Sequence, residues 1–125
     1  MKMHHVALIA ADYARSKRFY TEILGLEILA EHYRAARDSW KLDLGSGGHY
    51  LLELFSFPAP PPRANSPEAC GLRHLAFAVD DVTAQRAALQ AKGVACEAVR
   101  IDEYTGKPFF FIKDPDGLPI EFYQR

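Results

Sequence analysis

Short apolar runs alternate along this chain with Asp, Gly and Pro, and they follow the same order twice. In the first half, the apolar run over residues 5–10 stops before Asp12 and predicts a strand. A helix is predicted over 13–24, with Asp12 as its N-cap and Gly25 as the left-handed residue that ends it. The remaining predicted strands cover 27–33, 39–44 and 50–55. The predicted order is therefore βαβββ.

The second half repeats this order. A strand over 74–79 is followed by Asp80 or Asp81 as an N-cap, by an alanine-rich helix over 82–92, and by Gly93. Asp114-Pro115-Asp116-Gly117 is typical of a type I turn, with Pro at its second position and Gly at its fourth. The remaining predicted strands cover 94–101, 108–112 and 118–123. This half is again βαβββ.

The segment between the halves is rich in proline, which cannot donate the hydrogen bonds of a strand ladder. We expect it to be a linker over 58–68 that joins modules 1–57 and 69–125 within a single domain. The predicted fold class is α+β, with two βαβββ modules forming a curved mixed sheet. Helices are expected on the outside of this sheet.

Strand parity places the acidic residues of the last strands. Because neighbouring side chains of a strand point to opposite faces, Glu121 should face away from Ile120 and Phe122. By the same rule Glu53 should face away from Leu52 and Leu54. Each carboxylate should therefore point away from the helix-packed side, toward a concave face where a buried charge needs a partner.

A histidine and a glutamate recur in register with these modules. Glu53 follows His5 by 48 residues, and Glu121 follows His74 by 47. Two imidazoles and two carboxylates without a thiolate are typical of nickel, cobalt, zinc, manganese or iron(II) sites with water in the open positions. We therefore predict that His5, Glu53, His74 and Glu121 bind one divalent metal ion.

The other histidines fit this pattern less well. Parity would turn His4 to the helix side, and a seven-residue step to an Asp, shared with His74, favours His5 over His4. His32 and His49 have no counterpart in the other module and are predicted to be surface residues.

Composition narrows the classes of function. The chain has 125 residues, 49% of them hydrophobic and 25% charged, as in an ordinary globular domain. A formal charge of −1 argues against a nucleic-acid partner, and no apolar run is long enough for a membrane span or a signal peptide. Two cysteines without CxxC spacing do not form a disulfide framework. We expect a reduced, cytoplasmic protein.

Four stretches resemble the vicinal oxygen chelate (glyoxalase/bleomycin resistance/dioxygenase) superfamily. They are HVALIAADYARSKRFYTEILGLE, LLELF, GLRHLAFAVDD and FIKDPDGLPIEFYQ, and together they extend over nearly the whole chain. Within the superfamily the chain is most similar to small bacterial glyoxalase I-like proteins. The resemblance implies metal ligands at His5, Glu53, His74 and Glu121. It also implies a homodimer in which one subunit supplies the first two ligands of a site and its partner the other two.

The predicted function is that of a metal-dependent lyase or isomerase of the glyoxalase I type. Such an enzyme stabilises an enediolate-like anion of a substrate with adjacent oxygens, and Glu121, with Glu53 as its counterpart, is predicted to move the proton. The alternatives are transfer of a thiol to an epoxide, iron-dependent ring cleavage, and a non-catalytic protein that sequesters an antibiotic. Ring cleavage normally uses two histidines and one carboxylate, so the second glutamate argues against it.

Two positions depart from the glyoxalase I-like proteins that the chain resembles. Ile9 stands where those proteins tend to have an arginine that holds a glutathione carboxylate, and Phe57 stands where they have an asparagine. Both replacements argue against glutathione as a co-substrate. Other residues that are candidates for substrate specificity are Arg34, Arg37, Asp38, Ser39, Trp40, Tyr104, Lys107 and Phe109.

Overall fold

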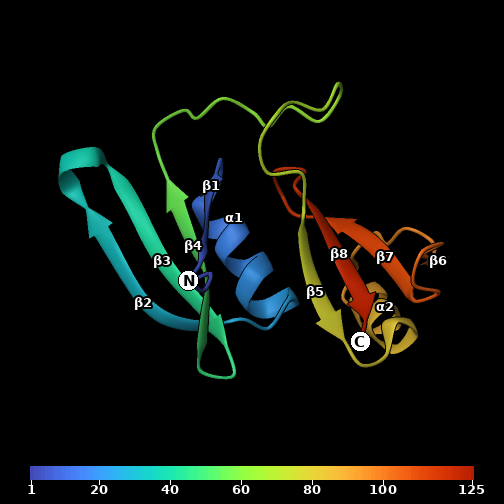
Figure 1. The fold of residues 1–125 in the computed structure, drawn as a ribbon. Coiled ribbons are helices and arrows are strands. Elements are labelled where there is room, and N and C mark those ends of the chain that lie inside the picture. The colour runs from blue at the N-terminus through green and yellow to red at the C-terminus, as the bar shows by residue number, and fades with distance from the viewer. The chain divides into compact units, whose positions relative to one another are not determined.

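The computed structural model describes residues 1–125. The chain forms two compact units, Met1–Pro62 and Arg63–Arg125. Each unit contains one four-stranded sheet and a principal helix (Figure 1). None of the helices is long and apolar enough to cross a membrane. The α+β class and the two βαβββ modules are thereby confirmed.

The first unit contains the elements β1 to β4. Their bounds are β1 Val6–Ala10, α1 Tyr13–Arg18, β2 Glu27–Arg34, β3 Ser39–Ser46 and β4 His49–Ser56, with a π-helical turn at Phe19–Ile23 and a 3₁₀ turn at Ala35–Arg37. The strand order is β1-β4-β3-β2, in which β1 runs parallel to β4 and the other neighbours are antiparallel. The last strand of the module therefore lies in the middle of the sheet, beside the first.

The second unit repeats this topology. Its elements are β5 Leu75–Val79, α2 Val82–Ala91, β6 Arg100–Ile101, β7 Pro108–Lys113 and β8 Pro119–Gln124. The strand order is β5-β8-β7-β6, and β5 again runs parallel to β8. The first and last strands of each module are thus neighbours, which is what brings a histidine before β1 or β5 close to a glutamate on β4 or β8.

The core of each unit lies between its helix and one face of its sheet. Helix α1 packs on β4, and α2 packs on β7 and β8. The buried apolar side chains alternate along the central strands, as expected when only one face is covered by a helix. On the strands of the first unit they are Leu42, Leu44, Leu52 and Leu54, with Tyr20 of the π-helical turn beside them, and on those of the second they are Phe110, Ile112, Ile120 and Phe122, with Leu89 of α2. The opposite face of each sheet is left for polar and aromatic side chains.

The predicted helix ends are confirmed. The Asp12 carboxylate accepts a hydrogen bond from the Arg15 amide (3.1 Å), and Asp81 does the same for the Ala84 amide (2.9 Å). Gly25 has a φ of 74°, which a residue with a side chain adopts at a cost. The helix over 13–24 differs in one respect, because it is α-helical only to Arg18 and then widens into the π-helical turn.

The prediction of a strand over 94–101 was wrong for residues 94–99. Only Arg100 and Ile101 form a ladder with β7, although the Glu97 amide donates one hydrogen bond to the Phe111 carbonyl of that strand (2.9 Å). The Arg86 side chain donates to the carbonyl oxygen of Glu97 (2.8 Å), and the Val94 amide donates to the Leu89 carbonyl at the end of α2 (3.1 Å). These bonds take up backbone groups that a strand ladder would need.

Candidate metal centre

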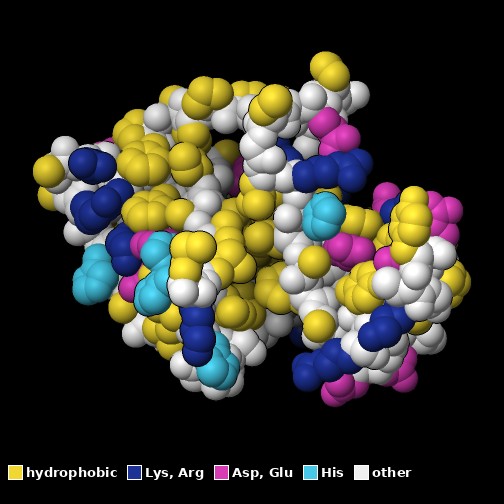
Figure 2. All heavy atoms as spheres, viewed as in Figure 1, with side chains coloured by type: hydrophobic (Ala, Val, Ile, Leu, Met, Phe, Trp, Pro, Cys, Tyr) yellow, Lys and Arg dark blue, Asp and Glu magenta, His cyan; other side chains and the backbone are white.

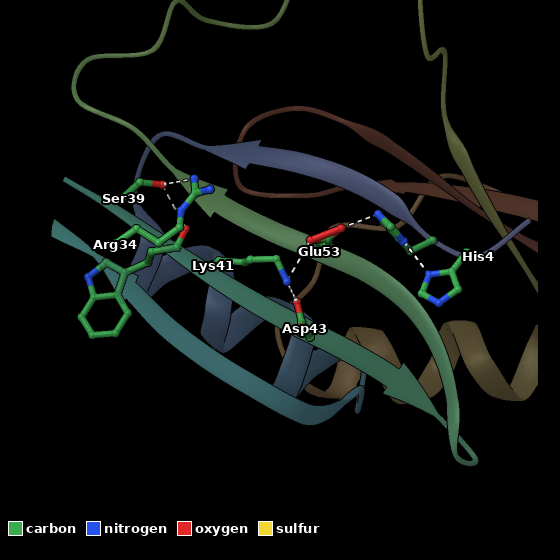
Figure 3. A network of polar contacts seen from close by, with 8 residues as sticks. His4, Arg34, Ser39, Lys41, Asp43 and Glu53 are labelled. Carbon is green, nitrogen blue, oxygen red and sulfur yellow. Dashed lines mark hydrogen bonds and ion pairs between the residues drawn. The ribbon is translucent and has the colours of Figure 1, made fainter. Parts of the chain in front are cut away.

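The first candidate pair, His5 and Glu53, lies on the sheet face away from α1. In the parallel β1/β4 pair Ala7 lies opposite Glu53, so His5, two residues before Ala7, shares the face of Glu53. His5 Nε2 contacts Glu53 Oε1 (Figure 3). The side chains are 33% and 10% exposed, respectively. The predicted orientation of Glu53 is therefore confirmed.

Lys41 holds the second oxygen of Glu53. Its Nζ lies 3.1 Å from Glu53 Oε2 and 2.6 Å from Asp43 Oδ1 (Figure 3). The hydrogen bond with Asp43 raises the pKa of Lys41 despite the opposing effect of burial. Burial also opposes ionisation of Asp43, but hydrogen bonds with Lys41 and Tyr50 outweigh it, so the pKa of Asp43 is lowered. Glu53 is thus fixed in a charged network.

His4 and Tyr50 fix the ring of His5. His4 Nδ1 lies 2.7 Å from His5 Nδ1, and the Tyr50 ring packs against the His5 ring with 5.2 Å between centroids. Burial, followed by the hydrogen bond with Asp43, raises the pKa of Tyr50 to about 12, so this phenol stays neutral at physiological pH. A histidine whose Nδ1 is held while its Nε2 faces a carboxylate is oriented as metal-ligating histidines usually are.

The second candidate pair, His74 and Glu121, has the same register. Ala76 lies opposite Glu121 in the parallel β5/β8 pair, and His74 precedes Ala76 by two residues. His74 Nε2 lies 3.2 Å from Glu121 Oε2, with side chains 30% and 14% exposed. The Phe111 ring packs edge-on against the His74 ring at 5.2 Å between centroids. The match in register confirms that the sequence repeat is also a structural repeat.

The donor atoms of the second pair are spaced as a divalent ion requires. Two ligands bound at about 2.1 Å and at right angles to each other are about 3 Å apart, which is close to the separation of His74 Nε2 and Glu121 Oε2. Imidazole nitrogen and carboxylate oxygen are also the donors expected for such ions. Each unit brings two of the four predicted ligands together, and neither holds a cluster of three or more His, Cys, Asp or Glu side chains suited to a metal. The convergence of both pairs on one ion stays a prediction.

The predicted specificity residues have different surroundings. Ile9 is exposed, and the ring of Phe57 stacks with that of Phe55 at 6.0 Å between centroids. The guanidinium carbon of Arg34 lies 4.9 Å from the centroid of Phe55, whereas Arg37 is exposed in the 3₁₀ turn. In the second unit Phe109 packs under Arg100, and Tyr104 and Lys107 are exposed.

Sequence reasoning missed the polar neighbours Lys41, Asp43 and Tyr50. A signal was present, because Lys41 and Asp43 alternate with the fully buried Leu42 and Leu44. The parity rule that places Glu53 also places these two side chains on its face when it is applied to β3.

The sequence matches the family model described as Glyoxalase/Bleomycin resistance protein/Dioxygenase superfamily over residues 2–122. A match over almost the full length agrees with the two repeated modules.

Individual relatives agree with this match. The chain is 58% identical to the uncharacterised protein YaeR of Escherichia coli K12, over 99% of this chain and 96% of that protein. It is 28% identical to a "Probable lactoylglutathione lyase" of Vibrio parahaemolyticus, over 97% of this chain and 88% of that protein. Its fold is similar to the crystal structure of a glyoxalase family protein from Enterococcus faecalis, with a TM-score of 0.92, 44% identity and coverage of 98% and 97% of the two chains.

Proposed function

Since the chain belongs to the glyoxalase/bleomycin resistance protein/dioxygenase superfamily, we propose that it is a metal-dependent lyase or isomerase of the glyoxalase I type. One divalent ion would be held by His5, Glu53, His74 and Glu121. The substrate would be a small molecule with adjacent oxygens, and the reaction would move a proton between neighbouring carbons. The likeness to a probable lactoylglutathione lyase supports this reaction class.

The observation that carries the proposal is the identical register of the two pairs. In both units the histidine lies two residues before the residue that pairs with the glutamate, and its Nε2 faces a carboxylate oxygen. An isolated His–Glu contact is common on protein surfaces. Two such contacts at equivalent positions of a repeat, each on the face away from the helix, are what a four-ligand site needs.

A bound ion would supply Lewis-acid polarisation of the substrate oxygens, which makes the proton on the neighbouring carbon more acidic. The chain must then supply a base that accepts this proton and returns it to the adjacent carbon. The step has no net gain or loss of atoms, because the proton taken from one carbon is delivered to the other.

Glu121 suits the role of this base better than Glu53. Lys41 and His5 each contact one oxygen of Glu53, so that carboxylate has both oxygens engaged. Glu121 makes an ion-pair contact with His74 alone. Its cross-strand neighbour on β7 is Phe111. A carboxylate without a lysine partner exchanges a proton more readily, so Glu121 would move the proton while Glu53 stays in place.

A second candidate function, sequestration of an aromatic small molecule, is favoured by one observation. The open face of the second sheet presents aromatic rings in contact with one another, with Phe109 stacked on Tyr123 and edge-on to Phe111. Such a surface binds aromatic ligands without a metal. Chelation separates the two functions, because a sequestering protein would keep its ligand affinity when the metal is removed, and the enzyme would lose turnover.

The proposal is tested by metal stoichiometry. The purified chain is stripped with a chelator and titrated with nickel, zinc, cobalt and manganese by calorimetry, and the bound ion is located by anomalous diffraction. We expect one ion per chain, with affinity reduced at least about tenfold in His5→Ala and in His74→Ala. His49→Ala serves as the control, because His49 is exposed and predicted to lie outside the site. Unchanged metal affinity in both ligand variants would overturn the proposal.

Turnover is then measured on the metal-loaded chain. Hemithioacetals of several thiols are compared with simple α-hydroxy ketones, before and after chelation. Turnover of at least one of them that disappears with the metal is the expected result.

A further inference from the structure

Arg34 lies on the same sheet face as Glu53 and has no carboxylate partner. Arg34 pairs with Ser39 in the β2/β3 register, and Asp43, four residues after Ser39, pairs with Glu53. Since residues four apart in a strand share a face, Arg34 and Glu53 lie on one face. No Asp or Glu oxygen lies within 4.0 Å of the Arg34 guanidinium.

The guanidinium of Arg34 is nevertheless held in place. Its carbon lies 4.9 Å from the centroid of Phe55 and 5.9 Å from that of Phe57, and Nη2 donates to the Oγ of the fully buried Ser39 at 3.0 Å (Figure 3). Nε is buried and has no hydrogen-bond partner. Figure 2 shows hydrophobic side chains beside Lys or Arg side chains over this part of the first unit, near the start of β3 and the end of β4.

Lys41, the neighbouring cation on this face, shows what is unusual about Arg34. Lys41 contacts two carboxylates, those of Asp43 and Glu53, so its charge is neutralised within the sheet. Arg34 is partly buried against aromatic rings without such compensation. Removing a cation from water without a counterion is unfavourable, and a bound anion would offset this cost.

We propose that Arg34 binds an oxyanion of the substrate, either a carboxylate or a phosphate. This inference rests on the proposed function, because it places a charged group on the molecule that the metal is proposed to hold. Residues two apart in a strand are separated by about 7 Å, so the guanidinium over Phe55 is one such step along β4 from Glu53. The distance between the proposed oxyanion and the reacting oxygens is therefore one that a small metabolite can span. A planar guanidinium binds such an oxyanion through two parallel hydrogen bonds.

The position of Arg34 distinguishes it from the other candidate specificity residues predicted from the sequence. Ile9 offers no charge, and Arg37 is exposed in the 3₁₀ turn, where its guanidinium stacks on neither Phe55 nor Phe57. An arginine that only covered Phe55 would be structural. Such a residue would leave anion affinity unchanged when its charge is removed.

The test uses inorganic phosphate and acetate as probes on the full chain, with and without bound metal. The Nε–H signal of Arg34, assigned by its loss in Arg34→Lys, is followed in ¹H–¹⁵N spectra during titration at constant ionic strength with chloride. We expect this signal to shift with at least one probe and not with chloride, and the stronger probe to identify the class of oxyanion. Calorimetric affinity for that probe should fall at least about tenfold in Arg34→Gln. Arg37→Gln, which removes the same charge from the same hairpin, should leave it within about twofold.

Two results would overturn the inference. One is the absence of a shift in the wild-type chain with both probes, which needs no variant to fold. The other is an equal loss of affinity in Arg34→Gln and Arg37→Gln, which would show a general charge effect. Failure of the proposed function has a different signature, because the chain would then bind the probe at Arg34 but show no dependence of metal affinity on His5 and His74.

Discussion

Asp43 and Phe111 occupy equivalent positions in the two units, each directly across the strand pair from the glutamate of its own sheet. Asp43 belongs to the charged network that holds Glu53, whereas Phe111 packs against the ring of His74. The repeat therefore preserves the two proposed ligands and replaces their neighbours. From this difference we expect Glu121 to exchange a proton more readily than Glu53.

The first prediction follows from this asymmetry. In metal-saturated protein, Glu121→Gln should lower kcat by about 10²–10⁴-fold, the usual contribution of a general base. Glu53→Gln should lower kcat less and weaken metal affinity more, because Glu53 is held by Lys41 as a fixed ligand. Steady-state kinetics of both variants, with the metal content measured in the same samples, tests this difference. An equal or larger loss of kcat in Glu53→Gln would contradict the assignment of Glu121 as the base.

The positions of the two glutamates on their sheets could be predicted because strand geometry is periodic. Once residues 50–55 and 118–123 are recognised as strands, a period of two fixes the face of Glu53 and Glu121. The cap at Asp12 was equally predictable, since a short acidic side chain before an apolar helical stretch satisfies free amide groups, whereas the choice of Asp81 over Asp80 for the second helix needed the structure.

The parts that sequence could not supply depend on tertiary contacts. Residues 94–99 have the composition of a strand, yet the Arg86 side chain and the end of α2 bind their backbone. That Arg34 has no carboxylate partner could also not be predicted, because it depends on which Asp and Glu side chains the fold brings near it. Neither contact has a local sequence signal.

The second prediction concerns glutathione. Wild-type chain should turn over the methylglyoxal–glutathione adduct weakly or not at all, because Ile9 and Phe57 cannot pair with its carboxylate. Ile9→Arg should raise kcat/KM for that adduct about tenfold, since an arginine–carboxylate hydrogen bond contributes about 1.5 kcal/mol or more. The substitution should fold, because Ile9 is 57% exposed. Ile101→Arg, at a similarly exposed position of the other unit, is the control.

Efficient turnover of the glutathione adduct by the wild-type chain would contradict this prediction. It would show that another cation, such as Arg34, replaces the missing arginine.

The third prediction concerns acid stability. Hydrogen bonds from Lys17 and then Tyr13 lower the pKa of Glu31 below its ordinary value of 4.5. A carboxyl with a lower pKa in the folded state stabilises the protein above its unfolded pKa, and this contribution disappears as the pH falls through the folded pKa. Glu31→Gln should therefore lower the free energy of unfolding at pH 7 by at most about 1 kcal/mol and have little effect below the folded pKa.

Urea unfolding between pH 7 and pH 3 measures this difference. Glu27→Gln, on the same strand and exposed, is the matched control and should leave the curve unchanged. A constant difference between wild type and Glu31→Gln at all pH values would show that the Tyr13 and Lys17 contacts act through packing instead of charge.

The last prediction concerns how the two pairs meet. We expect a homodimer in which each metal site takes His5 and Glu53 from one subunit and His74 and Glu121 from its partner. Sedimentation at micromolar concentration should then show a dimer when the metal is bound. A stable, metal-loaded monomer would remove the shared-site arrangement while leaving the ligand set intact.

Subunit mixing tests the sharing directly. His5→Ala chains and His74→Ala chains should each bind metal weakly when they are alone. In a mixed dimer, the His74→Ala chain still offers an intact first pair and the His5→Ala chain an intact second pair, so one of the two sites is complete. Random exchange of subunits should therefore restore about a quarter of the wild-type sites, measured by calorimetric stoichiometry. If both pairs of a site came from the same chain, every chain in the mixture would lack one ligand, and mixing would restore nothing.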